Sequence, residues 1–204
     1  MRSVNGWVCC VLENVSIVIP VAAGEGAHEI LLGDLEGLKS EIIISSEGSR
    51  ALSLNSGAVR AKRNFIWFLH ADSRVDARCF EALAECLERA PEGLHYFDLG
   101  FDGSGLMGLN AMGANVRSRV FGWPYGDQGF CVSLSVFDAV GGYPEDTIYG
   151  EDLLFVRKVR AAGVSLRRVP ARILTSARKY REGGWLAVTW AHWRGLFALL
   201  RVTI

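Results

Sequence analysis

The chain has little that would draw it to nucleic acid or hold it together through disulfides. Its 22 basic residues are balanced by 22 acidic ones. Without an excess of positive charge there is no long-range field to attract DNA or RNA, so we expect no nucleic-acid partner. The five cysteines are odd in number and have no metal-ligand spacing, which argues against a disulfide framework. We expect buried free thiols and a reducing, cytoplasmic environment.

Several common functional motifs are also missing. No Gly-x-Gly-x-x-Gly or phosphate-loop motif is present, which argues against dinucleotide and nucleoside-triphosphate enzymes. No Gly-x-Ser-x-Gly elbow is present, which argues against an α/β-hydrolase. There is no signal-peptide pattern, because Arg2 precedes only the short apolar patch from Trp7 to Leu12. His28, His95 and His192 stand alone and are interpreted as structural or surface histidines.

Half of the 204 residues are hydrophobic, enough for one domain with a sizeable core. The C-terminal stretch from Trp185 to Ile204 is apolar and aromatic but carries His192, Arg194 and Arg201. These charges argue against a membrane-spanning helix. For residues 183–204 two readings stay open, a helix docked on the core or an interfacial helix on the inner face of a membrane, anchored by Trp and Arg.

Strand and helix patterns alternate in the first part of the chain. Apolar runs at 15–19, 41–44 and 65–69 predict strands, and periodic segments at 28–38 and 50–61 predict helices. This alternation indicates a βαβαβ unit with parallel strands and right-handed crossovers.

The rest of the chain continues without a repeat or linker, so residues 1–204 are predicted to form a single domain. Segment 94–101 is mixed enough in polarity to predict an edge or antiparallel strand. The remaining expected elements are helices at 75–90, 103–121, 135–140 and 151–162, a short strand at 129–134, and one or two strands at 164–174 around Pro170.

The most informative stretch runs from Phe65 to Ser73. Its apolar start predicts a strand buried on both faces of a parallel sheet. His70 and Asp72 then lie just past the carboxyl end of that strand, where open α/β sheets bind ligands. Because residues i and i+2 of an extended chain point the same way, these two side chains could share a divalent metal.

Three further polar clusters could carry chemistry. Tyr125 to Gly129 contains Asp127 and Gln128. Glu151 and Asp152 open a predicted helix, where they either complement the helix dipole or supply a general base. The basic run from Arg178 to Arg181, which includes Lys179, is either a phosphate clamp or a solvated surface loop.

Taken together, these clusters resemble glycosyltransferase family 2, the inverting nucleotide-sugar transferases with the GT-A fold. The resemblance runs from Ser16 to about Trp185 and is closest to a small single-domain branch with Leu-His-Ala-Asp in place of Asp-x-Asp. The matching segments are Leu69-His70-Ala71-Asp72, Gly126-Asp127-Gln128, Phe137 to Pro144, Glu151-Asp152 and Ser176 to Lys179.

The resemblance implies an α/β, GT-A-like fold with a mixed, mostly parallel sheet flanked by helices. It implies a metal-dependent inverting transferase that moves a sugar from a nucleotide-diphosphate donor to an acceptor hydroxyl. A lipid-linked acceptor would fit the apolar C-terminus. The implied roles are Mg²⁺ or Mn²⁺ binding by Asp72 with His70, base catalysis by Asp152 with orientation by Glu151, an acceptor or sugar surface at Asp127 and Gln128, and diphosphate contact by Arg178 and Lys179.

One departure from the family pattern affects nucleotide recognition. Only one crossover helix fits between Ile44 and Phe65, so the fold is shortened after the second strand. The usual base-contacting Asp has no match; Glu47 is the nearest substitute, and Pro20 begins an altered first loop. A non-catalytic binding module on the same fold is therefore an alternative. A sugar nucleotidyltransferase is a weaker one, because residues 21–25 contain no Lys or Arg.

Overall fold

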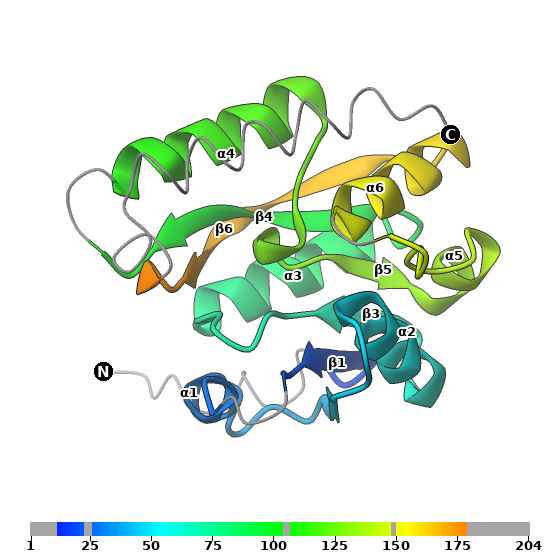
Figure 1. Cartoon of the computed structure of the whole chain (residues 1–204), viewed down its shortest axis with the longest axis horizontal. Coiled ribbons are helices and arrows are strands. Elements are labelled where there is room, and N and C mark those ends of the chain that lie inside the picture. Colours follow the sequence, from blue (N-terminus) through cyan, green and yellow to red (C-terminus); the bar gives the residue numbers. More distant parts are fainter. Residues whose placement is uncertain (1–11, 23–25, 104–106, 148–149, 179–204) are drawn as a thin grey trace.

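The computed structural model describes residues 12–22, 26–103, 107–147 and 150–178 (Figure 1). Lys179 and the segment 183–204 lie outside the described residues. The elements are β1 (Val15–Pro20), α1 (His28–Asp34), β2 (Glu41–Ser45), α2 (Arg50–Arg60), β3 (Phe65–Phe68), α3 (Ala77–Arg89), β4 (Leu94–Phe101), α4 (Met107–Phe121), the short 3-10 helix η3 (Gly126–Gln128), β5 (Cys131–Ser133), α5 (Leu134–Ala139), α6 (Glu151–Ala161) and β6 (Leu166–Thr175).

The described strands form one six-stranded sheet in the order β2-β1-β3-β5-β4-β6. β1 pairs in parallel with β2 and β3, and β4 pairs in parallel with β6. β5 is antiparallel to both of its neighbours. The predicted mixed, mostly parallel sheet flanked by helices is therefore confirmed. The single helix α2 between β2 and β3 also agrees with the predicted shortening.

The prediction of an edge or antiparallel strand at residues 94–101 is confirmed in part. β4 is antiparallel to β5, but it is not an edge strand. β4 lies inside the sheet between β5 and β6 and runs in the same direction as β1 and β3, so β5 is the reversed strand. The polar residues that gave this segment its edge-like pattern are paired internally. His95 Nε2 lies 2.9 Å from the carbonyl of Ala90, and Asp98 pairs with Arg119 and Arg168 at 2.6 and 2.9 Å.

Residues 164–174 form one strand with an irregularity. The pairing of β6 with β4 passes from Val169 opposite Phe97 to Arg172 opposite Asp98. Pro170 and Ala171 are thus skipped, as expected because proline has no N–H to donate to a neighbouring strand.

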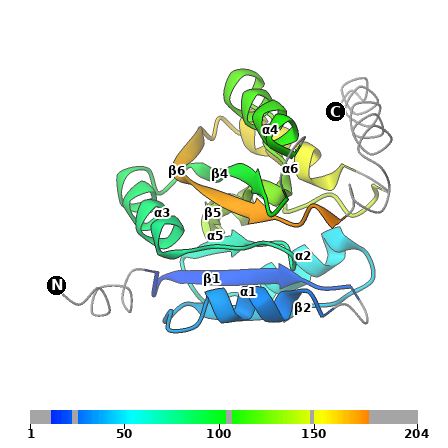
Figure 2. The same ribbon diagram turned by 90° about the vertical axis from the view of Figure 1, so that its left-hand side faces the viewer.

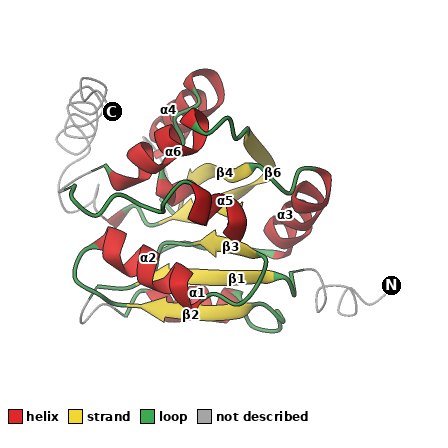
Figure 3. Cartoon of the chain, turned by 90° about the vertical axis from the view of Figure 1, so that its right-hand side faces the viewer, coloured by secondary structure: helices red, strands yellow, loops and turns green. Residues whose placement is uncertain are grey.

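Alternating side chains of the strands fill a separate core on each face of the sheet. On one face Trp67 and Leu69 pack with α1 and α3, and on the other Ile66 and Phe68 pack with α2, α5 and α6 (Figure 3). This period-two alternation is what a strand covered on both sides requires. The described cysteines Cys79, Cys86 and Cys131 are free. Cys79 and Cys131 are buried as expected, whereas Cys86 is only partly buried. Burial raises the pKa of Cys79 to about 11, so this thiol serves as a packing group.

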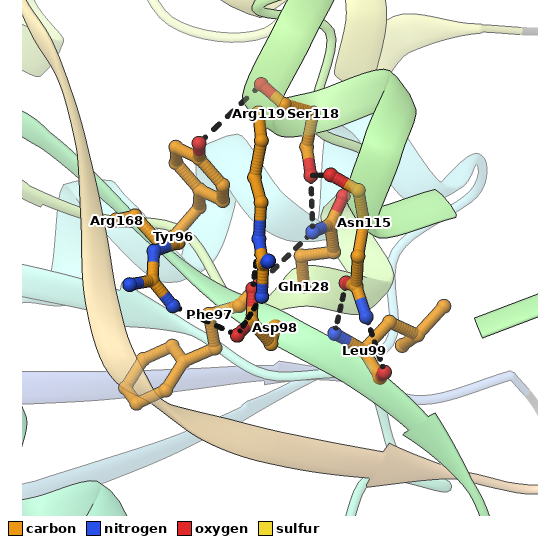
Figure 4. Close-up of polar contacts among 9 residues, drawn as sticks. All are labelled: Tyr96, Phe97, Asp98, Leu99, Asn115, Ser118, Arg119, Gln128 and Arg168. Atoms are coloured by element: carbon orange, nitrogen blue, oxygen red, sulfur yellow. Dashed lines mark hydrogen bonds and ion pairs between the residues drawn. The ribbon is translucent and has the colours of Figure 1, made fainter. Parts of the chain in front are cut away.

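Helix α4 is fastened to β4 by polar contacts (Figure 4). Asn115 accepts a hydrogen bond from the amide of Leu99 at 2.8 Å and donates one to its carbonyl at 3.0 Å.

The outer side of α4 exposes Leu109, Met112, Val116 and Val120. Within the described ranges, no helix is both long enough and apolar enough to cross a membrane.

Helix α2 is seated tightly on β1. A Cβ atom added at Gly57 would overlap Cγ1 of Val18, so only glycine allows this close approach. Asn55 then ties the same helix to the turn after α5. Its amide nitrogen donates to the carbonyl of Tyr143 at 2.9 Å and its oxygen accepts from the amide of Tyr143 at 2.9 Å. The N-terminus of α2 is thereby fixed at one edge of the sheet.

Gly57→Ala should lower the free energy of unfolding by about 1–3 kcal/mol, because overpacking against Val18 outweighs the helix propensity of alanine. The matched control is Gly113→Ala on α4, where a Cβ would meet no atom within 4 Å and stability should rise by up to about 1 kcal/mol. Urea denaturation measures both. Equal stability of the two variants would contradict the close seating of α2.

Candidate active site

The topology gathers polar side chains at one edge of the sheet. The arrowheads of β1, β4 and β6 point toward the same side (Figure 2). β3 runs in the same direction and β5 in the opposite one, so the loop that precedes β5 reaches this edge too. The carboxyl edge of such a sheet is where ligands bind in open α/β folds.

A pocket of about 240 Å³ lies at this edge. It contains Pro20, His70, Asp72 and Arg178, four residues that the sequence singled out. The other residues that line it come from the end of β1, the start of α2 and the loop after β3: Val21, Ala22, Gly48, Ser49, Arg50, Ser53 and Ala71.

Arg50 joins this pocket to the start of α6. Its guanidinium contacts Nε2 of His70. Its Nη2 atom lies 3.2 Å from Oδ2 of Asp152 and its Nε atom 3.5 Å from Oε1 of Glu151. Burial lowers the pKa of Arg50, but the carboxylates of Asp152 and Glu151 outweigh that effect and raise it. Arg50 therefore stays a cation.

Sequence reasoning missed Arg50 as a site residue. It is a single basic residue at the start of a predicted helix, and Asp152 is 102 positions away in the chain. The signal that pointed to it is its place, because the first residues after the carboxyl end of a parallel strand face the ligand-binding edge.

Asp152 pairs with Arg50 beside the pocket and does not cap its own helix. The N-cap of α6 is Gly150, which is in the left-handed region at φ 85° and makes no side-chain cap. The carboxylate of Asp152 packs on Gly126, where an added Cβ would lie 2.5 Å from Oδ1. That oxygen is buried and accepts no hydrogen bond from the described residues. Asp152 is not among the residues that line the pocket, so its role as a general base stays a prediction.

Asp127 adds a second buried carboxylate. Burial raises its pKa, the charges of Asp152 and Asp72 raise it further, and Arg117 and Arg50 oppose the shift. Its Oδ1 atom is buried and accepts no hydrogen bond from the described residues. The two arginines thus offset only part of the rise in the pKa of Asp127.

Gln128 supports the site from beneath and does not line it. Its side chain is fully buried, with Nε2 donating to the carbonyl of Phe97 at 2.8 Å and to Oγ of Ser118 at 3.1 Å (Figure 4). Its Oε1 accepts from the amide of Tyr125 at 3.2 Å. The expected contact of Gln128 with acceptor or sugar does not fit this placement, because its amide is used to hold the loop that carries Asp127.

Glu47 also turns away from the pocket. Its carboxylate accepts a hydrogen bond from Oγ of Ser56 at 2.6 Å, and its main chain makes two hydrogen bonds with Oγ of Ser53. Its neighbours Gly48 and Ser49 line the pocket instead. Glu47 therefore supports the start of α2. It does not border the pocket, although the sequence predicted a contact with the nucleotide base.

The donor atoms fit a divalent metal only in part. No three His, Cys, Asp or Glu side chains of the described residues gather as a metal site. Mg²⁺ is commonly held by one or two carboxylates together with substrate phosphates, and Asp72, whose Oδ2 is 3.5 Å from Oγ1 of Thr175, suits that role. His70 does not suit it in this arrangement, because its Nε2 meets the guanidinium of Arg50.

No protein-family model matches the sequence, and no curated protein matches it. Solved structures share the fold. S. aureus TarS superposes with a TM-score of 0.61 at 14% identity over 80% of this chain and 36% of its own. A structure of TarS residues 1–349 gives 0.60 at 14% identity over 81% and 61%.

The mannosyltransferase PcManGT from Pyrobaculum calidifontis, in complex with GDP-Man and Mn²⁺, gives a TM-score of 0.56 at 13% identity over 79% of this chain and 56% of its own. The chain thus spans less than two thirds of each of these proteins. At this identity the likeness establishes the fold alone, which is GT-A-like.

Asp127→Asn should raise the free energy of unfolding at neutral pH by about 1–3 kcal/mol, because it removes a buried, incompletely paired charge. Since folding raises the pKa of Asp127 above 3.8, the wild-type protein loses stability relative to the variant as pH rises from that value through the folded pKa. Urea denaturation from pH 4 to 8 measures the difference. If the difference in unfolding free energy between the variant and the wild type became smaller as pH rises, the raised pKa of Asp127 would be contradicted.

Proposed function

We propose that this protein is a glycosyltransferase that moves a sugar, with inversion, from a nucleotide-diphosphate donor to an acceptor hydroxyl. The observation that carries the proposal is a pocket lined by Arg50 and Arg178 at the ligand edge of a GT-A-like sheet, with Asp152 paired to Arg50 at 3.2 Å. PcManGT, with GDP-Man and Mn²⁺ bound, supports a nucleotide-sugar donor and a divalent metal.

The pocket suits the diphosphate part of the donor. Its volume of about 240 Å³ is below the ~300–1,000 Å³ typical of sites for whole small molecules. Arg50 and Arg178 supply guanidinium groups, which match phosphate oxygens well. Asp72 would hold Mg²⁺ or Mn²⁺ against the same oxygens. Such a cation would neutralise charge on the departing nucleoside diphosphate.

Asp152 is the proposed general base. Its carboxylate accepts the proton of the acceptor hydroxyl while the hydroxyl oxygen forms a bond to the anomeric carbon. The bond from that carbon to the diphosphate oxygen breaks, and the electron pair leaves with the nucleoside diphosphate. Glu151, beside it at the start of α6, shares the charge of Arg50 and helps to orient the base.

A non-catalytic binding module is the second candidate, because Oδ2 of Asp152 is already paired with Arg50 and its Oδ1 is buried. Turnover separates the two functions. A sugar nucleotidyltransferase is less well supported, since Val21 and Ala22 are the residues of the loop after β1 that line the pocket, and neither is basic.

Asp152→Asn should lower the rate of nucleoside-diphosphate release from the wild-type protein's preferred nucleotide sugar by about 10²–10⁴-fold, because the base is lost. Binding of the nucleoside diphosphate with Mn²⁺ should survive. The assay screens a panel of nucleotide sugars, GDP-Man among them, with a set of acceptors. Glu81→Gln, at an exposed position on α3, is the matched control and should keep full activity.

Wild-type turnover in Asp152→Asn would remove Asp152 from the role of base. Binding of nucleoside diphosphates without turnover of any nucleotide sugar would favour the binding module. No binding of any of them would contradict both functions.

A further inference from the structure

Arg50 contacts both parts of the candidate site, the pocket and the start of α6. Its guanidinium lines the pocket and also contacts His70, Glu151 and Asp152. Its side chain is 38% exposed, whereas those of Glu151 and Asp152 are 15% and 14% exposed. The cation is therefore open to an incoming anion on the pocket side, while its carboxylate partners are largely shielded.

The partners of Arg50 would change when a diphosphate arrives. A guanidinium binds phosphate oxygens through the same forked N–H groups that it uses for carboxylates. Arg50 is also the first residue of α2, an 11-residue helix whose N-terminus favours anions and whose N-cap Ser49 lines the pocket. A diphosphate in the pocket and Asp152 would thus compete for one cation.

We propose that Arg50 is a coupling residue: a diphosphate bound in the pocket draws its guanidinium away from Asp152, so the base is released only when the donor is present. The coupling rests on the proposed function for the nature of the anion. Arg50 acts here through Asp152 and is a positioning residue for the chemical step. The coupling explains both why Arg50 lies against His70 and why the proposed base Asp152 is held in an ion pair.

Thermodynamic linkage makes this coupling measurable. If the anion and Asp152 compete for Arg50, weakening the Arg50–Asp152 pair must strengthen anion binding by the same free energy. The effect of Asp152 on the anion must also pass through Arg50. A double-mutant cycle isolates that pathway from simple repulsion between Asp152 and the anion.

The test is calorimetric titration of the full chain with inorganic pyrophosphate in the presence of EDTA. Arg50→Gln should weaken pyrophosphate binding by about 10-fold, because the forked cation is lost. Asp152→Asn should tighten it by about 5-fold, because Arg50 no longer has a competing partner. The double variant should match Arg50→Gln alone. Arg89→Gln, on the exposed face of α3, is the matched cation control and should leave binding unchanged.

Arg50→Lys guards against misfolding, since it keeps the charge and should bind pyrophosphate with an affinity between those of wild type and Arg50→Gln. The proposal is overturned if Asp152→Asn tightens binding equally in the Arg50→Gln background, because the effect would then be direct repulsion. It is also overturned if Arg50→Gln binds as wild type does, or if the wild type does not bind pyrophosphate.

The readout is independent of glycosyl transfer. If the cycle gives the expected pattern but no nucleotide sugar is turned over, the coupling stands and the proposed function fails. If nucleotide sugars are turned over but the cycle shows no coupling, the proposed function stands and this inference fails.

Discussion

The close seating of α2 on β1 is the constraint on which the candidate site depends. Gly57 lets the helix approach Val18 without a Cβ in between, and Asn55 fastens it to the turn at Tyr143. Because α2 is the single helix between β2 and β3, its first turn opens directly onto the pocket. The same packing that stabilises the sheet thus sets the position of Arg50 relative to α6.

Electrostatics explains why a carboxylate-rich cleft is tolerated at that edge. Asp127 and Asp152 are largely withdrawn from water, and burial together with the charge of Asp152 raises the pKa of Asp127. Arg50 and Arg117 offset this cost, and Arg117 is itself held 3.5 Å above the ring of Tyr125. Such a balance can be shifted by an added anion or cation, as expected of a site that binds charged substrates.

Much of this arrangement follows from local patterns in the sequence. The apolar runs that form β1, β2 and β3 predict a βαβαβ unit. Because Phe65–Phe68 is entirely apolar, the polar residues His70 and Asp72 are expected beyond its carboxyl end. The position of β4 inside the sheet and the structural role of Gln128 could not be predicted in this way, because both depend on partners from other elements. Asp98 is neutralised by Arg119 from α4 and by Arg168 from β6, and Gln128 is satisfied by Phe97 and Ser118. The role of Arg50 could not be predicted for the same reason, since its partners His70, Glu151 and Asp152 lie in other elements.

The most direct test of the donor site is a crystal structure of the protein with a nucleoside diphosphate and Mn²⁺. The account predicts an anomalous manganese signal beside Asp72, a diphosphate in the pocket within hydrogen-bonding distance of Arg50, and an Arg50–Asp152 separation longer than the present 3.2 Å. A nucleotide and metal bound away from this pocket, or a bound diphosphate with the Arg50–Asp152 pair intact, would contradict it.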